Sequence, residues 1–246
     1  MSHQPRALVT GASSGIGWAA AEALRDAGWT VTCLVRRPVA PVGTEVVLGD
    51  AADVEALDRA VTTAAPDGRL DALVCAAGTP PSGPWDDADH WARTIAVDLT
   101  APYDAARVAW PALRAAGGCA ILVGSIVGTT EGSGRSPAYA AAKAGLEGLA
   151  RSLAVVGGPD GVRVNVVAPG AIDTPFDPAA FPPADRPDVP LGRMGTAAET
   201  AAVIAFLASP AARYVSGAVW TVDGGRSVLS PAAAAAAGVA RTQRDR

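Results

Sequence analysis

The chain has 246 residues and a formal net charge of −4; half of its residues are apolar and 18% are charged. This composition suits one folded domain with a large aliphatic core, and the scattered arginines form no basic stripe that would bind a nucleic-acid backbone. Only two histidines are present, and the three cysteines lie far apart, without the spacing of a zinc site. We therefore expect no metal, no nucleic-acid partner and buried, unreactive thiols.

A membrane location is not indicated either. No uninterrupted apolar run reaches the roughly 18 residues that cross a bilayer. Met1 to Pro5 leads directly into a strand pattern, without the charged and apolar regions of a signal peptide. We expect a cytoplasmic protein that makes no contact with a membrane.

Short β-branched runs alternate along the chain with alanine-rich segments that are long enough to form helices. Seven such runs are candidate strands: residues 7–10, 31–35, 46–48, 72–75, 120–123, 162–167 and 219–222. Most are apolar throughout, as expected for strands that helices cover on both faces. The pattern predicts a single α/β domain with a doubly wound, seven-stranded parallel sheet and helices on both faces.

Capping residues indicate where two of the helices begin. Ser136 can cap a helix whose first turn holds Pro137, and Thr196 with Glu199 forms a capping box ahead of an apolar stretch. Residues 168–195 contain seven prolines and are too numerous for an ordinary connection. We interpret them as a substrate-covering loop, with a solvated linker as the alternative.

The C-terminal end differs from the rest of the chain. Residues 231–246 contain six consecutive alanines and three arginines but no periodic apolar face, which indicates a frayed or disordered tail. We therefore predict one domain over residues 1–230, which includes the substrate-covering loop, followed by this tail.

A glycine-rich turn follows the first predicted strand and precedes a helical run. Its glycines allow the backbone to approach a pyrophosphate, and the helix N-terminus offers free N–H groups to an anion. The turn therefore predicts dinucleotide binding by Gly11, Ser13, Ser14, Gly15, Ile16 and Gly17.

Lys143 is the only lysine among twenty basic residues, and it stands four residues after Tyr139. On the helix that begins near Ser136 the two side chains share one face. Reduction of a carbonyl requires a proton donor, and a neighbouring ammonium together with a positive nicotinamide ring would favour ionisation of an otherwise weakly acidic phenol. We predict that Tyr139 is the catalytic acid and base and that Lys143 assists it.

The TGxxxGxG spacing of the turn and the Tyr139/Lys143 pair resemble the short-chain dehydrogenase/reductase family, and the resemblance extends over residues 6–226. It implies a Rossmann-like fold, a homotetramer, and a member most similar to 3-oxoacyl reductases. It also implies that Ser125, after the fifth strand, hydrogen-bonds the substrate oxygen. The further cofactor contacts that it implies are Asp50, Ala51, Ala76, Ala77, Gly78, Tyr139, Lys143, Pro169, Gly170, Ile172 and Thr174.

The end of the second strand distinguishes the two nicotinamide cofactors. NAD enzymes carry an acidic residue there for the ribose 2′-hydroxyl, whereas this chain has Val35 followed by Arg36 and Arg37. Two guanidinium groups can pair with a 2′-phosphate, although Ser14 is uncharged where NADP-type relatives carry a second basic residue. We predict NADP(H), with ordinary loop charges as the alternative for the two arginines.

Three departures from the family pattern bear on the site. Ser125 lies fourteen residues before Tyr139, one more than usual, so that the loop between them holds an extra residue. Asp98 stands where the family commonly has an asparagine that supports a water chain to the lysine, and we expect it to retain a role in catalysis, with a structural role as the alternative. Cys75 and Ala76 replace the asparagines that usually precede Ala77 and Gly78.

The sequence thus favours an NADP(H)-dependent ketoreductase that acts on a small ketone or, in reverse, on a secondary alcohol. A cofactor-binding regulator or scaffold without turnover is one alternative. A lyase or epimerase on the same fold is another, and it would not consume NADPH stoichiometrically.

Overall fold

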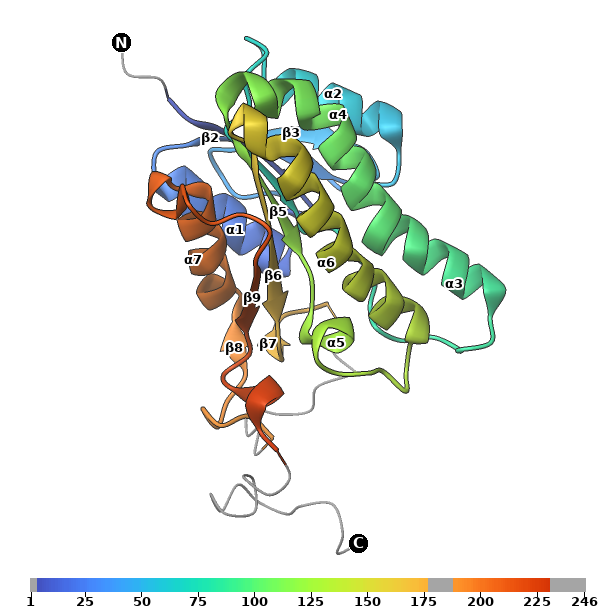
Figure 1. Ribbon diagram of the computed structural model, residues 1–246. Coiled ribbons are helices and arrows are strands. Elements are labelled where there is room, and N and C mark those ends of the chain that lie inside the picture. Colours follow the sequence, from blue (N-terminus) through green and yellow to red (C-terminus); the bar gives the residue numbers. More distant parts are fainter. Residues whose placement is uncertain (1–3, 177–187, 231–246) are drawn as a thin grey trace, which may run out of the picture.

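Seven parallel strands form one sheet in the order β3-β2-β1-β4-β5-β6-β9. They belong to a computed structural model that describes residues 4–176 and 188–230 (Figure 1). The strands are β1 (Arg6–Thr10), β2 (Thr30–Val35), β3 (Glu45–Leu48), β4 (Ala72–Cys75), β5 (Cys119–Val123), β6 (Arg163–Pro169) and β9 (Val219–Val222). All seven predicted strands are present, and the predicted doubly wound parallel sheet is confirmed.

Helices cover both faces of this sheet, as the apolar strands predict (Figure 1). One face packs against α1 (Gly15–Asp26) and α7 (Ala197–Ala208), and the other packs against α2 (Val54–Ala64), α4 (Ala101–Ala116) and α6 (Pro137–Gly157). Within β1, Leu8 contributes to the second of these cores whereas Ala7 and Val9 contribute to the first. Successive side chains of a strand point to opposite faces, which explains why the whole strand is apolar.

Shorter elements connect and extend these layers. They are α3 (Ala88–Ile95), a π-helical turn η1 (Ala96–Thr100), α5 (Ile126–Thr129), β7 (Ile172–Asp173), β8 (Gly195–Thr196) and the 3-10 turns η2 (Gly158–Asp160), η3 (Pro210–Ala212) and η4 (Arg226–Val228). In the part of the chain that the structure describes, no helix is both long enough and apolar enough to cross a membrane.

The predicted substrate-covering loop is more regular at its ends than the sequence indicates. Its first two residues, 168 and 169, complete β6, and β7 pairs in parallel with β8 near its far end. That pairing brings the ends of the segment together. Residues 177–187 within the predicted loop, and the predicted tail over 231–246, lie outside the described residues.

Both predicted helix starts are confirmed. The Ser136 hydroxyl accepts a hydrogen bond from the Tyr139 amide (3.3 Å) at the beginning of α6. At α7 the Thr196 hydroxyl accepts from the Glu199 amide (3.2 Å), and the Glu199 carboxylate accepts from the Thr196 amide (2.8 Å). The capping box therefore satisfies two backbone donors at the start of α7.

Replacement of Thr196 by alanine is expected to lower the free energy of unfolding by about 1 kcal/mol, because one of these donors loses its acceptor. Urea denaturation measures this change. Thr63→Ala is the matched control: its exposed hydroxyl bonds only to the Arg59 carbonyl within α2, and its loss is expected to cost less than about 0.5 kcal/mol. Equal losses for the two variants would contradict a capping role.

Candidate active site

A cavity of about 480 Å³ lies at the carboxyl ends of the central strands, where open α/β sheets bind their ligands. Every residue predicted to contact a cofactor lines it. They are Gly11, Ser13, Ser14, Gly15, Ile16, Gly17, Arg36, Arg37, Asp50, Ala51, Ala76, Ala77, Gly78, Tyr139, Lys143, Pro169, Gly170, Ile172 and Thr174. Ser125 lines the same cavity, whereas Asp98 lies beneath its wall and is fully buried.

The glycine-rich turn has a shape that suits a dinucleotide. Gly11 has a φ of +73°, and a Cβ placed there would lie 2.5 Å from the backbone nitrogen of Ala77. A Cβ at Gly17 would lie 2.4 Å from the Gly11 carbonyl oxygen. Side chains at these two positions would therefore fill or distort the cradle, and the glycines bring the backbone close to the space a pyrophosphate needs.

The N-terminus of α1 adds free donors to this cradle. No acidic residue lies in its first turn, and the Ser14 side chain forms no capping hydrogen bond. The first N–H groups and the positive end of the helix dipole are thus available to an anion. The glycine-rich turn and the N-terminus of α1 therefore have the shape and the free donors that the predicted dinucleotide requires.

Arg36 and Arg37 follow β2 directly and are exposed at one end of the cavity, next to the buried Val35. Within residues 4–176 and 188–230, neither guanidinium forms an ion pair with a carboxylate. A phosphate at this end of the cavity would meet two positive charges and no negative side chain at position 35.

Helix α6 holds Tyr139 and Lys143 side by side. The Lys143 Nζ lies 5.4 Å from the centroid of the Tyr139 ring, and it donates a hydrogen bond to the Val123 carbonyl at the end of β5 (3.0 Å). Ser125 follows β5 by two residues; its Oγ accepts from the Val127 amide (3.1 Å), and its hydroxyl also interacts with the Tyr139 phenol. The three predicted catalytic side chains therefore meet at one cavity.

Burial changes the titration of the phenol. Removal from water raises the pKa of Tyr139 above its ordinary value; Lys143 lowers that pKa, Asp98 raises it further and the Ser125 hydroxyl lowers it. The expected acidification by lysine is present, but in the chain alone burial outweighs it. The reason is that the phenol is almost completely enclosed by protein.

Asp98 lies in the π-helical turn η1 and contacts the lysine directly. Its Oδ1 is 3.1 Å from Lys143 Nζ, and its carboxylate also accepts hydrogen bonds from the Thr79 amide (3.1 Å to Oδ2) and the Thr79 hydroxyl. The structure thus has an ion pair where the sequence suggested support of a water chain. Thr79 was not predicted, because nothing in its local sequence marks it as the partner of a residue nineteen positions away.

A second set of residues at the cavity was also missed. Arg226, after β9, pairs with Glu131 through Nε (2.9 Å) and Nη2 (3.1 Å), and its Nη1 lies 2.9 Å from Asp188. Arg226 and Glu131 both line the cavity. Glu131 and Arg226 are 95 positions apart, so no local pattern could have joined them.

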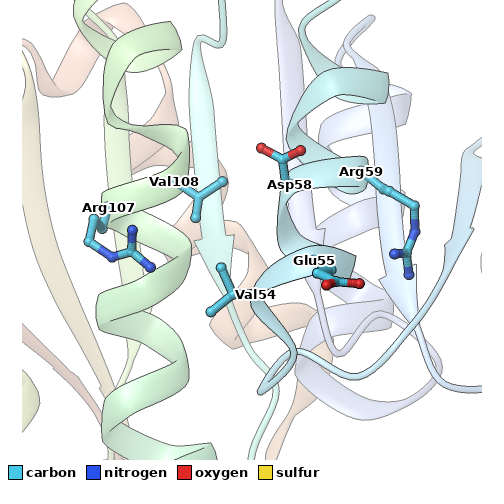
Figure 2. Close-up of a pocket in the computed structure, with 6 residues that line it drawn as sticks. All are labelled: Val54, Glu55, Asp58, Arg59, Arg107 and Val108. Atoms are coloured by element: carbon cyan, nitrogen blue, oxygen red, sulfur yellow. The ribbon is translucent and has the colours of Figure 1, made fainter.

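Another hollow lies between α2 and α4 and offers no comparable chemistry. Figure 2 shows Val54 and Val108 between the two helices, with charged side chains around them. Its lining consists of Val54, Glu55, Asp58, Arg59, Arg107 and Val108. It has no proton donor paired with a buried ammonium and no phosphate-binding turn, so it is not the candidate active site.

The cysteines are buried and free, as predicted. Burial raises the pKa of Cys75 to about 12, with Lys143 opposing the shift, and raises that of Cys119 to about 11. Neither thiol is ionised near neutral pH. Among the residues that the structure describes, no group of three or more His, Cys, Asp or Glu could hold a metal ion.

Comparisons with known proteins agree with this geometry. A family model described as enoyl-(acyl carrier protein) reductase matches residues 11–227. The chain is 40% identical to cis-4-hydroxycyclohexanecarboxylate dehydrogenase of Sinomonas cyclohexanicum, over 91% of this chain and 96% of that protein. It is 38% identical to the 3-oxoacyl-[acyl-carrier-protein] reductase MabA of Mycobacterium bovis, over 89% and 91% of the two chains.

A similar solved structure is that of the aldohexose dehydrogenase of Thermoplasma acidophilum, with a TM-score of 0.85 and 27% identity over 93% of this chain and 96% of that one. The match thus covers the sheet, the cavity and nearly the full length of each relative. The chain therefore belongs to the short-chain dehydrogenase/reductase family and is an oxidoreductase that transfers hydride between a nicotinamide cofactor and a ketone or secondary alcohol.

Proposed function

We propose that the chain is an NADP(H)-dependent ketoreductase in which Tyr139 is the proton donor. The observation that carries this proposal is the convergence of Ser125, Tyr139 and Lys143 on the cavity that the glycine-rich turn borders. The hollow between α2 and α4 has none of these side chains.

The cofactor, when bound, supplies or receives the hydride. The turn from Gly11 to Gly17 would hold its pyrophosphate, and Arg36 with Arg37 would pair with the 2′-phosphate. Asp50 and Ala51 would contact the adenine end. Lys143 would bind the nicotinamide ribose, and the remaining contacts to the nicotinamide half would come from Ala76, Ala77, Gly78, Pro169, Gly170, Ile172 and Thr174.

The side chains of the site divide the remaining work of carbonyl reduction. Ser125 donates a hydrogen bond to the substrate oxygen and holds it near the phenol. As negative charge develops on that oxygen, the Tyr139 hydroxyl gives it a proton, and the adjacent ammonium of Lys143 stabilises the phenolate that remains. In alcohol oxidation the phenolate form of Tyr139 takes the proton from the alcohol.

Ketones and secondary alcohols are the substrates that fit this chemistry. The names of two relatives, a hydroxycyclohexanecarboxylate dehydrogenase and a 3-oxoacyl reductase, both describe interconversion of a secondary alcohol and a ketone. We propose the same reaction class for this chain, on a small molecule that reaches the cavity beside Phe176.

The proposal extends to assembly and location. β9 is the edge of the main sheet, with one side of its backbone unpaired by another described strand, and Val155 and Val156 on α6 are exposed. An open edge and exposed apolar side chains favour association with further copies. We propose a cytoplasmic homotetramer that assembles through the helices holding Asp98 and Tyr139 and through the β9 edge.

Tyr139→Phe is expected to reduce kcat for ketone reduction by a factor of about 10²–10⁴, since the phenyl ring retains the packing but has no proton to give. The measurement is NADPH consumption against a panel of ketones, with the alcohol product quantified. Tyr103→Phe, which removes a hydroxyl from a half-exposed ring on α4, should leave the rate unchanged. Turnover without stoichiometric NADPH oxidation would indicate a lyase or epimerase, and cofactor binding without any turnover would indicate a regulator.

Replacement of Arg36 or Arg37 by alanine is expected to raise KM for NADPH by a factor of roughly 10 to 100 and to leave KM for NADH nearly unchanged, because a charge-assisted hydrogen bond to the 2′-phosphate contributes about 1.5–3 kcal/mol. Steady-state kinetics with both cofactors measures this effect. Arg107→Ala, at an exposed position on α4 far from the cofactor cavity (Figure 2), is the matched control and should change neither value. Equal losses with NADPH and NADH would contradict the role assigned to the two arginines.

A further inference from the structure

Asp98 and Lys143 form a buried ion pair at the base of the cavity. The Asp98 side chain is fully buried and that of Lys143 is 5% exposed, and their charged atoms are 3.1 Å apart. Two of the three Lys143 donors are directed at Asp98 Oδ1 and the Val123 carbonyl. One donor therefore remains for groups on the cavity side, where Tyr139 lies.

The surroundings of Asp98 hold its carboxylate in one orientation. Thr79 directs both its amide and its hydroxyl at the carboxylate. Gly78 leaves the required space: a Cβ there would lie 2.8 Å from Asp98 Oδ1 and 3.7 Å from Lys143 Nζ. These hydrogen bonds stabilise the buried carboxylate in its charged form, so that it can pair with Lys143.

The charges that face Tyr139 come from few elements. Lys143 on α6 is positive and Asp98 on η1 is negative, while Cys75 on β4 is a neutral thiol beside the lysine. His90 on α3 reaches the Ser136 hydroxyl at the start of α6 (3.2 Å). A neutral side chain at position 98 would leave the ammonium uncompensated next to the phenol, whereas the negative charge of Asp98 opposes the effect of the ammonium on the phenol.

We propose that Asp98 is a positioning residue that offsets the charge of Lys143 and thereby holds Tyr139 in its protonated form, the form that donates to a substrate oxygen. This inference rests on the proposed role of Tyr139 as proton donor. The ion pair would then favour carbonyl reduction over alcohol oxidation, because reduction needs the phenol form of Tyr139 and oxidation needs its phenolate.

The titration of both partners is consistent with this role. Burial raises the pKa of Tyr139, Lys143 lowers it and Asp98 raises it again. Burial works to lower the pKa of Lys143, but the attraction of Asp98, followed by that of Tyr139, outweighs burial and raises it. Lys143 thus stays charged, and Asp98 limits the effect of that charge on the phenol.

The test titrates the phenol itself, without cofactor or substrate. In a Tyr103→Phe/Tyr214→Phe background Tyr139 is the only tyrosine, so near-ultraviolet absorbance of tyrosinate reports its ionisation alone. Asp98→Asn in this background should lower the midpoint by about one pH unit or more, as expected for loss of a unit charge close to a buried phenol. An unchanged or higher midpoint would overturn the inference.

Two controls separate charge from packing. Asp104→Asn removes the same charge from an exposed ion pair with Arg107 on α4 and should leave the midpoint unchanged. Thr79→Val removes a hydroxyl that bonds to Asp98 but keeps the carboxylate, and it should not lower the midpoint. A decrease as large as that of Asp98→Asn in either control would show that packing or net charge, and not the local ion pair, sets the titration.

The pH dependence of turnover provides a second measurement. In Asp98→Asn the alkaline rise of kcat/KM for alcohol oxidation should move to lower pH by the same amount as the tyrosinate midpoint, and the decline of reduction should move with it. Profiles that coincide with those of the unmodified enzyme would overturn the inference. If no ketone supports NADPH oxidation by the unmodified chain, the proposed function fails, while the tyrosinate titration still decides the electrostatic role of Asp98.

Discussion

The site depends on the interactions that compensate the buried ammonium of Lys143. A charge removed from water destabilises the fold unless partners replace its hydration, and here the partners are a carboxylate from η1 and a backbone carbonyl from β5. Those two contacts join α6 to η1 and to the end of β5. The same lysine that faces the phenol therefore also links these three elements.

The parallel sheet explains why residues far apart in the chain meet around this lysine. Every strand of the main sheet runs in the same direction, so the segments that follow β1, β2, β4, β5 and β6 all emerge at one edge. Glycines at that edge let the first of these segments pack against the backbone after β4. The cavity is the space that remains between these segments and α6, and its chemistry comes from the few side chains that enter it.

Local patterns predicted a large part of this architecture. The seven strands were identified because each is a short apolar run, and both helix starts because caps require particular residues at particular spacings. The contacts around Asp98 could not be predicted in the same way. An aspartate in a helical stretch has the same local sequence whether it faces water or a lysine forty-five positions later, and only the packing of η1 beneath α6 distinguishes the two.

Several properties of this protein are determined by sequence alone, namely the family, the parallel sheet, and the positions of the glycine-rich turn and of Tyr139 and Lys143. Each of these is recorded in local patterns along the chain. Tertiary structure alone decided that Asp98 pairs with Lys143, that Thr79 holds Asp98, and that Arg226 joins Glu131 and Asp188. It also decided that burial outweighs the lysine at the phenol. The physical reason is that desolvation and long-range pairing depend on what surrounds a side chain in space, which spacing along the chain does not record.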